Sequence, residues 1–252
     1  MKAAAIKLIL VSLAILAAAC AHENRFKKAS PEVQAKTNMQ LSIEYMKLNQ
    51  MAESRDAIER ALTQAPGSAE VQMTAGIVYE RINDVPKAER AYSTMYRLKK
   101  DDPNIGNAYA GFLCRSGKTA EGEKLFEAVA KSALYQTPEV ALTNAGVCVS
   151  TTGDLVDAER YFNRALAIHP NFPEAMLQLG SIEFQRGDAA AARDTVQRFL
   201  AVNPPTPEVL WLGFRASRKI GDNSGAAAYA RRVQAEFPSS EQAQMLRSGI
   251  DR

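Results

Sequence analysis

The sequence is poor in the residues from which most enzyme sites are built. It contains only two histidines, three cysteines and one tryptophan in 252 residues. His22 and His169 have no spacing that suggests a metal pair, and no Cys-x-x-Cys pair, glycine-rich phosphate loop or Gly-x-Ser-x-Gly motif is present. We therefore expect no catalytic residue, no metal and no small-molecule substrate. A catalytic group assembled from distant segments stays open.

The sequence also lacks a hydrophobic run long enough to span a membrane. Its longest apolar stretch, Leu8 to Ala19, covers about a dozen residues and follows Lys2 and Lys7, whereas a spanning helix needs roughly 20. This pattern predicts a signal peptide over residues 1–19. Its removal lowers the formal net charge from +3 to +1, which argues against nucleic acid as a partner because phosphate binding requires clustered cations.

The residue after the apolar stretch is Cys20, and three alanines precede it. Small residues followed by Cys resemble a bacterial lipobox, which implies a covalent lipid on Cys20 and no other cofactor. Ala17 stands where Leu is usual, so ordinary cleavage nearby is the alternative. By resemblance to lipoprotein sorting in Gram-negative bacteria, Ala21 in place of Asp implies the periplasmic face of the outer membrane. Residues 20–34 then form a flexible tether.

What the sequence does contain is a repeat of 34 residues. Three kinds of residue keep this period over the second half of the chain: Gly153, Gly187 and Gly221; Ala158, Ala192 and Ala226; Pro170, Pro204 and Pro238. A period of this length is typical of stacked helical hairpins, each too small to bury its apolar face alone. Such arrays are binding surfaces.

The repeat resembles the tetratricopeptide pattern, most clearly at Ala145-Gly146, Gly153, Ala158, Phe162 and Pro170. The resemblance implies an all-α, right-handed superhelical array of six helix-turn-helix repeats. We place the repeats at 35–68, 69–102, 103–138, 139–172, 173–206 and 207–240, with a capping helix at 241–252 that uses Ala243, Leu246 and Ile250. Gly122 replaces the small Ala in the third repeat, which also carries about two extra residues before Pro138.

Cys114 and Cys148 lie in the first helices of adjacent repeats. Neighbouring helix axes are typically about 8 to 10 Å apart, whereas a disulfide needs Cα atoms within about 7 Å. This comparison disfavours a disulfide, although an oxidising compartment would permit one. Both states stay open.

The first helix of repeat one carries two apolar stripes where a hairpin needs one. We expect Leu41, Tyr45 and Leu48 to pack on the partner helix, which leaves a second stripe to be covered. The predicted partner-binding groove consists of this second stripe and the equivalent positions of repeat two, namely Met39, Ile43, Met46, Met73 and Ile77. A Met-rich apolar groove suits an amphipathic helix, and burial by the array itself is the alternative.

Polar residues at other concave positions of the first helices are candidates for contacts with a partner, or are solvated surface. They comprise Asn107, Arg115, Asn144 and Gln178, a basic stripe of Arg215, Arg218 and Lys219, and the neighbouring Trp211. Trp211 is either part of the cap packing or a binding anchor.

The run Asn107-Ala108-Tyr109-Ala110-Gly111-Phe112-Leu113-Cys114 resembles an Asn-x-Tyr-Gly-x-Phe-Leu-Cys run in the third repeat of the type IV pilus biogenesis and stability lipoproteins of the PilF/PilW type. Ala110 departs from that pattern. The resemblance, with the lipobox and six repeats, implies a pilotin: an outer-membrane lipoprotein that binds the secretin subunit of a type IV pilus and promotes its localisation and multimerisation. The alternatives are a scaffold of barrel assembly or of cell-wall and division machinery and, more remotely, a periplasmic accessory hydrolase.

Overall fold

The structure, a computed structural model, describes residues 29–249, and this part of the chain folds as thirteen α-helices without a strand. It divides into two compact units, with the boundary between Pro66 and Gly67. The helices are α2 (Pro31–Lys47), α3 (Met51–Gln64), α4 (Ala69–Arg81), α5 (Val85–Leu98), α6 (Pro103–Arg115), α7 (Thr119–Ala130), α8 (Pro138–Ser150), α9 (Leu155–Ile168), α10 (Pro173–Gln185), α11 (Ala189–Val202), α12 (Pro207–Lys219), α13 (Asn223–Glu236) and α14 (Glu241–Ser248).

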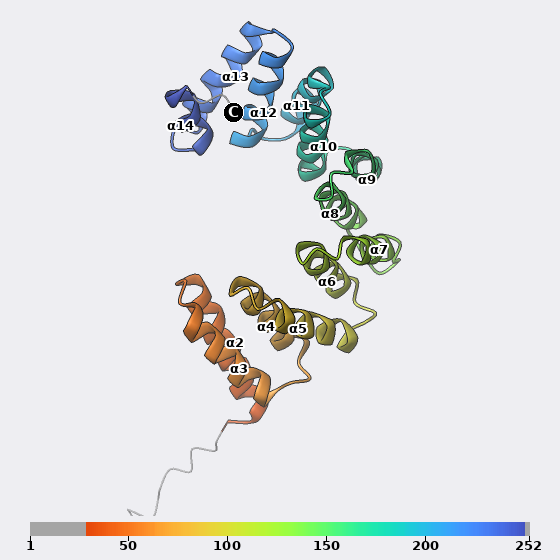
Figure 1. Cartoon of the computed structure of the whole chain (residues 1–252), viewed down its shortest axis with the longest axis vertical. Helices are drawn as coiled ribbons and strands as arrows, with labels where there is room; N and C mark the ends of the chain where they lie inside the picture. The colour runs from red at the N-terminus through yellow and green to blue at the C-terminus, as the bar shows by residue number, and fades with distance from the viewer. Residues whose placement is uncertain (1–28, 250–252) are drawn as a thin grey trace, which may run out of the picture. The chain divides into compact units, whose positions relative to one another are not determined.

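Consecutive helices pack as hairpins. The first unit consists of the hairpin α2/α3, and the second contains α4/α5, α6/α7, α8/α9, α10/α11 and α12/α13 in chain order (Figure 1). The predicted tetratricopeptide array of six helix-turn-helix repeats is therefore confirmed. In the second unit α14 packs on α12 and α13, and the fully buried Ala243 joins a core cluster with Leu210 and Val233. Ile250 lies outside the described residues.

The hairpins share one kind of turn. In each turn one residue has positive φ, which L-residues other than Gly and Asn rarely adopt. These residues are Asn49, Asn83, Gly117, Gly153, Gly187 and Gly221. The 34-residue glycine spacing thus reports a backbone requirement, and asparagine meets the same requirement in the first two repeats.

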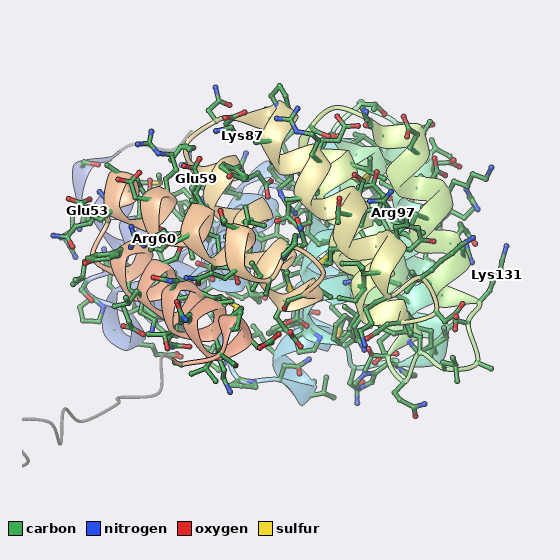
Figure 2. All side chains as sticks on the ribbon, turned by 90° about the horizontal axis from the view of Figure 1, so that it is seen from below. Glu53, Glu59, Arg60, Lys87, Arg97 and Lys131 are labelled. Atoms are coloured by element: carbon green, nitrogen blue, oxygen red, sulfur yellow. A yellow bond between two sulfur atoms is a disulfide. The ribbon has the colours of Figure 1, made fainter. Side chains whose placement is uncertain are left out.

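The hairpins of the second unit curve. The first helix of one hairpin lies close to the first helix of the next, as α6 does with α8, α8 with α10 and α10 with α12, whereas among the described residues no two second helices approach as closely through their backbones. The first helices therefore line the inner, concave side of this unit (Figure 1). Lys131, which directly follows α7, points away from the molecule (Figure 2), and Arg97 on α5 is exposed.

Each hairpin closes through small residues at its helix crossing. In the fourth hairpin, Ala158 and Phe162 are fully buried. A Cβ atom at Gly146 would lie 2.6 Å from the Phe162 ring, so the glycine is needed for this close approach. Gly76 has the same relation to the ring of Tyr92, at 2.8 Å. The small and large residues that recur in the repeat therefore pack against each other at the helix crossings.

The first hairpin departs from two expectations. Helix α2 begins at Pro31, four residues before the predicted start, because Pro31 is favourable in the first turn and Ser30 Oγ accepts a hydrogen bond from the backbone N–H of Val33. Residues 31–34, assigned to the tether from sequence, are thus helical.

The apolar stripe predicted to pack on the partner helix does not do so. Leu41 is 42% exposed and Leu48 68% exposed, while Tyr45 is half-buried. The crossing instead uses Ser42, whose hydroxyl donates to the Ser54 carbonyl at 2.9 Å, as Ser54 does in return. Two small residues allow closer backbone approach than a leucine would, and this decides which face of α2 is buried.

Candidate functional site

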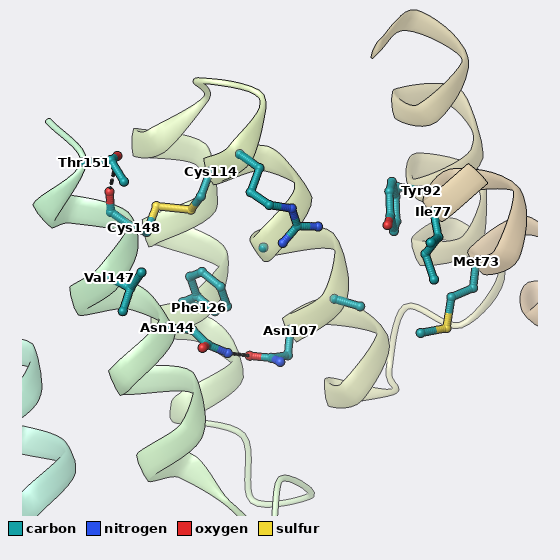
Figure 3. A pocket seen from close by; sticks show the side chains of 13 residues that line it. Met73, Ile77, Tyr92, Asn107, Cys114, Phe126, Asn144, Val147, Cys148 and Thr151 are labelled. Atoms are coloured by element: carbon teal, nitrogen blue, oxygen red, sulfur yellow. Dashed lines mark hydrogen bonds between the residues drawn. A yellow bond between two sulfur atoms is a disulfide. The ribbon is translucent and has the colours of Figure 1, made fainter. Parts of the chain in front are cut away.

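A cavity of about 460 Å³ opens on the concave side of the second unit, between α4, α6 and α8 (Figure 3). It lies where the backbones of α4 and α6 do not approach each other closely. Its apolar wall consists of Met73, Ile77, Tyr92, Phe126 and Val147. Its polar members include Asn107, Arg115, Asn144 and Thr151, and Cys114 and Cys148 complete one wall. A mostly apolar hollow with a few directed polar groups is the usual form of a binding site.

The predicted groove residues fall in both units. Met73 and Ile77 lie on α4 and face the cavity from the side opposite α8 (Figure 3). Met39, Ile43 and Met46 lie on α2 in the first unit, where each is half-buried. A single groove that combines all five residues stays a prediction. The cavity brings Met73 and Ile77 together with residues of repeats three and four.

Two asparagines join the polar side of the cavity. Asn144 Nδ2 donates a hydrogen bond to Asn107 Oδ1 at 3.2 Å, across the gap between α8 and α6. Within residues 29–249 the side-chain NH2 group of Asn107 and the side-chain carbonyl of Asn144 have no protein partner. The amide pair therefore offers N–H donors and a carbonyl acceptor, which match the needs of a peptide backbone.

An ion pair spans the other end of the cavity. Arg115 on α6 donates through Nε to Glu80 Oε1 at 2.6 Å and through Nη2 to Oε2 at 3.2 Å. Tyr92 on α5 also donates to Glu80 Oε2, at 2.9 Å. Burial of the phenol, together with the neighbouring Glu80 carboxylate, raises the pKa of Tyr92, so Tyr92 stays a neutral donor. The hydrogen bond to Glu80 raises the pKa of Arg115.

Cys114 and Cys148 form a disulfide, with Cα atoms 5.5 Å apart, so the distance argument against pairing was wrong. That argument compared helix axes, whereas Cα atoms lie on a cylinder of about 2.3 Å radius. Facing Cα atoms of helices 8 to 10 Å apart can therefore approach to roughly 5 Å. The contact between α6 and α8 brings the two residues face to face.

The disulfide accounts for an irregularity of the third repeat. Gly122 occupies the position that is Ala in most of the repeats, and a Cβ atom there would overlap Cys114 Sγ and lie 2.9 Å from the Ala110 carbonyl oxygen. The sulfur takes the space that the alanine methyl would fill. The sequence contained both signals, the missing methyl and the two cysteines.

The remaining predicted residues are dispersed. Gln178 is half-buried on α10 and lies outside the cavity lining. Trp211 is also half-buried, with its ring centroid 5.1 Å from that of Phe214. Arg215, Arg218 and Lys219 line a second hollow. Cys20 lies outside the described residues.

Among residues 29–249 no helix combines the length and the apolarity that crossing a membrane requires. The same residues contain no group of three or more His, Cys, Asp or Glu side chains suited to hold a metal ion. The absence of catalytic activity stays a prediction.

Comparisons with known proteins agree with this geometry. A tetratricopeptide-repeat model matches residues 39–103 and 113–173, half of the chain, and a second such model matches residues 151–216. The crystal structure of PilW, a type IV pilus biogenesis factor, is similar with a TM-score of 0.68 and 28% sequence identity, over 84% of this chain and 97% of that one. PilF of Pseudomonas aeruginosa has the same fold, with a TM-score of 0.63 and 19% identity over 87% of this chain and 99% of that one.

Among curated proteins, cellulose synthase operon protein C of Pseudomonas fluorescens is 23% identical over 188 residues, which is 72% of this chain and 15% of the relative. The chain thus spans about 15% of the length of that relative. The helical hairpins, their left-handed turns and a family model over half of the sequence lead to one assignment. The chain belongs to the tetratricopeptide repeat family, whose arrays act as protein-binding scaffolds.

Proposed function

We propose that the protein is a pilotin: a lipoprotein, anchored through Cys20 at the periplasmic face of the outer membrane, that binds the secretin subunit of a type IV pilus and promotes its localisation and multimerisation. The observation that carries the proposal is the similarity to PilW, which spans nearly the whole of that structure at 28% identity. The third-repeat run that resembles the PilF/PilW family supports it. That run supplies Asn107, Gly111 and Cys114 to the cavity wall.

The cavity is the proposed site of client binding within the second unit. Its apolar wall would accept large apolar side chains of the client, and Asn107 and Asn144 would hold the client backbone. Apolar burial supplies most of the affinity in such a site, while the few hydrogen bonds fix direction. Met39, Ile43 and Met46 are proposed as a further apolar contact surface on the first unit. No step of this function requires catalysis, a metal or a small molecule.

The lipid has a distinct role in the proposal. An acyl chain contributes about 0.8 kcal/mol of membrane affinity per buried methylene, so the lipids on Cys20 would hold the protein at the membrane. A client bound to the repeats is then confined near the same surface, which raises its local concentration for assembly.

The test is affinity capture from membranes with the full-length protein and three variants. Ile77→Glu places a charge in the cavity, and Val156→Glu is its matched control, because Val156 is 65% exposed on the second helix α9. Cys20→Ala removes the proposed anchor. We expect secretin subunits to be recovered with wild-type protein and Val156→Glu, and to be lost with Ile77→Glu.

Membrane fractionation separates anchoring from binding. Cys20→Ala should still bind the secretin in solution, while secretin multimers in the outer membrane decrease. Recovery of barrel-assembly, cell-wall or division proteins in place of the secretin would contradict the proposal and favour the alternative scaffolds. Equal recovery with Ile77→Glu and Val156→Glu would place the client away from the cavity.

A further inference from the structure

A second hollow of about 260 Å³ lies on the concave side of the second unit, at repeats five and six. Its walls come from α10 and α12, two first helices that contact each other directly. It is lined by two aromatic rings, Phe184 and Phe214, and three cations, Arg215, Arg218 and Lys219. We call it the aromatic-cationic cavity. None of these residues belongs to the cavity of repeats two to four.

Two of the cations are stacked on the two rings. The guanidinium of Arg215 lies 4.5 Å from the centroid of Phe184, and that of Arg218 lies 5.7 Å from the centroid of Phe214. Trp211 packs against Phe214 and supports it. Stacking on a ring restricts a guanidinium and shields one of its faces, while its N–H groups at the edge remain available to an anion.

Two of the three cations of this cavity, Arg215 and Lys219, have no carboxylate partner in the described part of the chain. Among the residues that the structure describes, no carboxylate lies within ion-pairing distance of Arg215 or Lys219. Other arginines of this array are paired, for example Arg115 with Glu80 and Arg164 with Glu127. The unpaired Arg215 and Lys219, beside the Phe184 ring, therefore point to an anionic ligand with an apolar part.

The shape of the surface favours a peptide over a membrane. The cavity lies on the inner side of a curved stack, which a narrow chain can enter and a flat layer of lipid headgroups cannot approach closely. Arg215 and Lys219 are four residues apart on α12, so their Cα atoms differ by about 6 Å along the helix. Alternate side chains of an extended peptide are about 6.8 Å apart on one face.

We propose that the aromatic-cationic cavity binds an acidic segment of a protein partner, with alternate carboxylates on Arg215 and Lys219 of α12 and the apolar side chains of its opposite face against Phe184 of α10. This site is separate from the proposed secretin-binding cavity, and the proposal does not depend on the pilotin assignment. Arg218, in the last turn of α12, lies over the Phe214 ring and is not assigned a carboxylate of the peptide.

The experiment uses the chain without its signal peptide and with the disulfide intact. The probe is a fluorescent dodecapeptide of alternating Glu and Leu, and its control has Gln in place of Glu. The test variant is Arg215→Gln/Lys219→Gln. The matched control is Arg90→Gln/Arg231→Gln, which removes the same charge from exposed positions on the second helices α5 and α13. Binding is measured by fluorescence anisotropy at two salt concentrations.

We expect the acidic peptide to bind wild-type protein and the control variant alike, and to bind the test variant about tenfold more weakly, since two ion pairs are lost. The Gln peptide should bind poorly to all three. Because Arg215 packs on Phe184, circular dichroism must show that the test variant is folded. Arg215→Glu/Lys219→Glu provides a second readout, since it should prefer a peptide of alternating Lys and Leu.

Three results would overturn the proposal. One is equal affinity of wild-type and test variant for the acidic peptide, and another is equal affinity of wild-type protein for the Glu and Gln peptides. The third is binding of phosphatidylglycerol vesicles that requires Arg215 and Lys219 while the acidic peptide does not bind, which would assign the cavity to lipid headgroups.

Discussion

Replacement of Gly122 by alanine tests whether the disulfide and the third hairpin are packed as described. Alanine is the regular residue at this position in the repeat, and it favours a helix by about 1 kcal/mol over glycine. In this hairpin, however, the new methyl would overlap Cys114 Sγ and lie 2.9 Å from the Ala110 carbonyl oxygen. The repeat pattern alone predicts that Gly122→Ala stabilises the protein, whereas the structure predicts that it destabilises it.

The magnitude follows from two opposing contributions. Overpacking in a tight core costs about 1 to 3 kcal/mol, and the helix propensity of alanine returns about 1 kcal/mol. We expect a net loss of about 0.5 to 2 kcal/mol in the free energy of unfolding of the oxidised protein. In a Cys114→Ala/Cys148→Ala background the sulfur is absent, and the same substitution should be neutral to within about 1 kcal/mol.

The assay is urea denaturation followed by circular dichroism, with all four proteins compared as a double-mutant cycle. The cost of losing the disulfide itself cancels, since each comparison is made within one background. Gly111→Ala on α6 is the control, because its Cβ would meet no backbone atom and only the end of the long Arg115 side chain, with Nη1 at 3.0 Å. Equal effects of Gly122→Ala in both backgrounds, within about 0.5 kcal/mol, would refute the assignment of the glycine to the sulfur.

Three further predictions concern stability. Ala158→Leu should overpack the fourth hairpin, where Ala158 is fully buried, and lower the free energy of unfolding by about 1 to 3 kcal/mol; an unchanged melting temperature would contradict the repeat register. Ser54→Ala should lower the free energy of unfolding by about 1 kcal/mol, and the double variant Ser42→Ala/Ser54→Ala should lower it little further, because the two serines are each other's hydrogen-bond partners. Urea titrations of both variants would test this. The hydrogen bond from Arg164 holds the pKa of Glu127 at about 2, so the pair stabilises the protein fully above about pH 4.3 and progressively less as pH falls towards 2. Arg164→Gln should remove about 1 kcal/mol of this acid-dependent stability. Identical pH profiles of melting temperature for wild-type protein and the variant would contradict the prediction.

The fold could be predicted because the same backbone requirement recurs in each repeat. Gly153, Gly187 and Gly221 mark turns with positive φ, and a glycine requirement is legible in a sequence. Asn49 and Asn83 meet the same requirement, but asparagine also occurs on helix surfaces, so its presence alone did not reveal the turns. The buried face of α2 was misassigned because its large apolar residues are not the ones at the helix crossing.

The cavity was predictable only in part. Met73 and Ile77 were identified from their position on the first helix of a repeat, and Asn107, Arg115 and Asn144 were recognised as concave positions. Their convergence on one hollow depends on the separation of α4 from α6, which is a property of packing between hairpins and leaves no periodic signal in the sequence. The disulfide was disfavoured because distances between axes were used in place of distances between facing Cα atoms.

The irregularities of the third hairpin coincide with the wall of the cavity, and this is the strongest structural argument that the cavity is used. Gly122 makes room for the disulfide that forms part of the wall. The extra residues before Pro138 place Tyr135 in the core cluster that also holds Phe126, a wall residue. The departures of the first two repeats, Ser54 at the helix crossing and Asn49 and Asn83 at the turns, keep the same local geometry. In a fold otherwise consistent from repeat to repeat, local rules are expected to fail where function imposes a different demand.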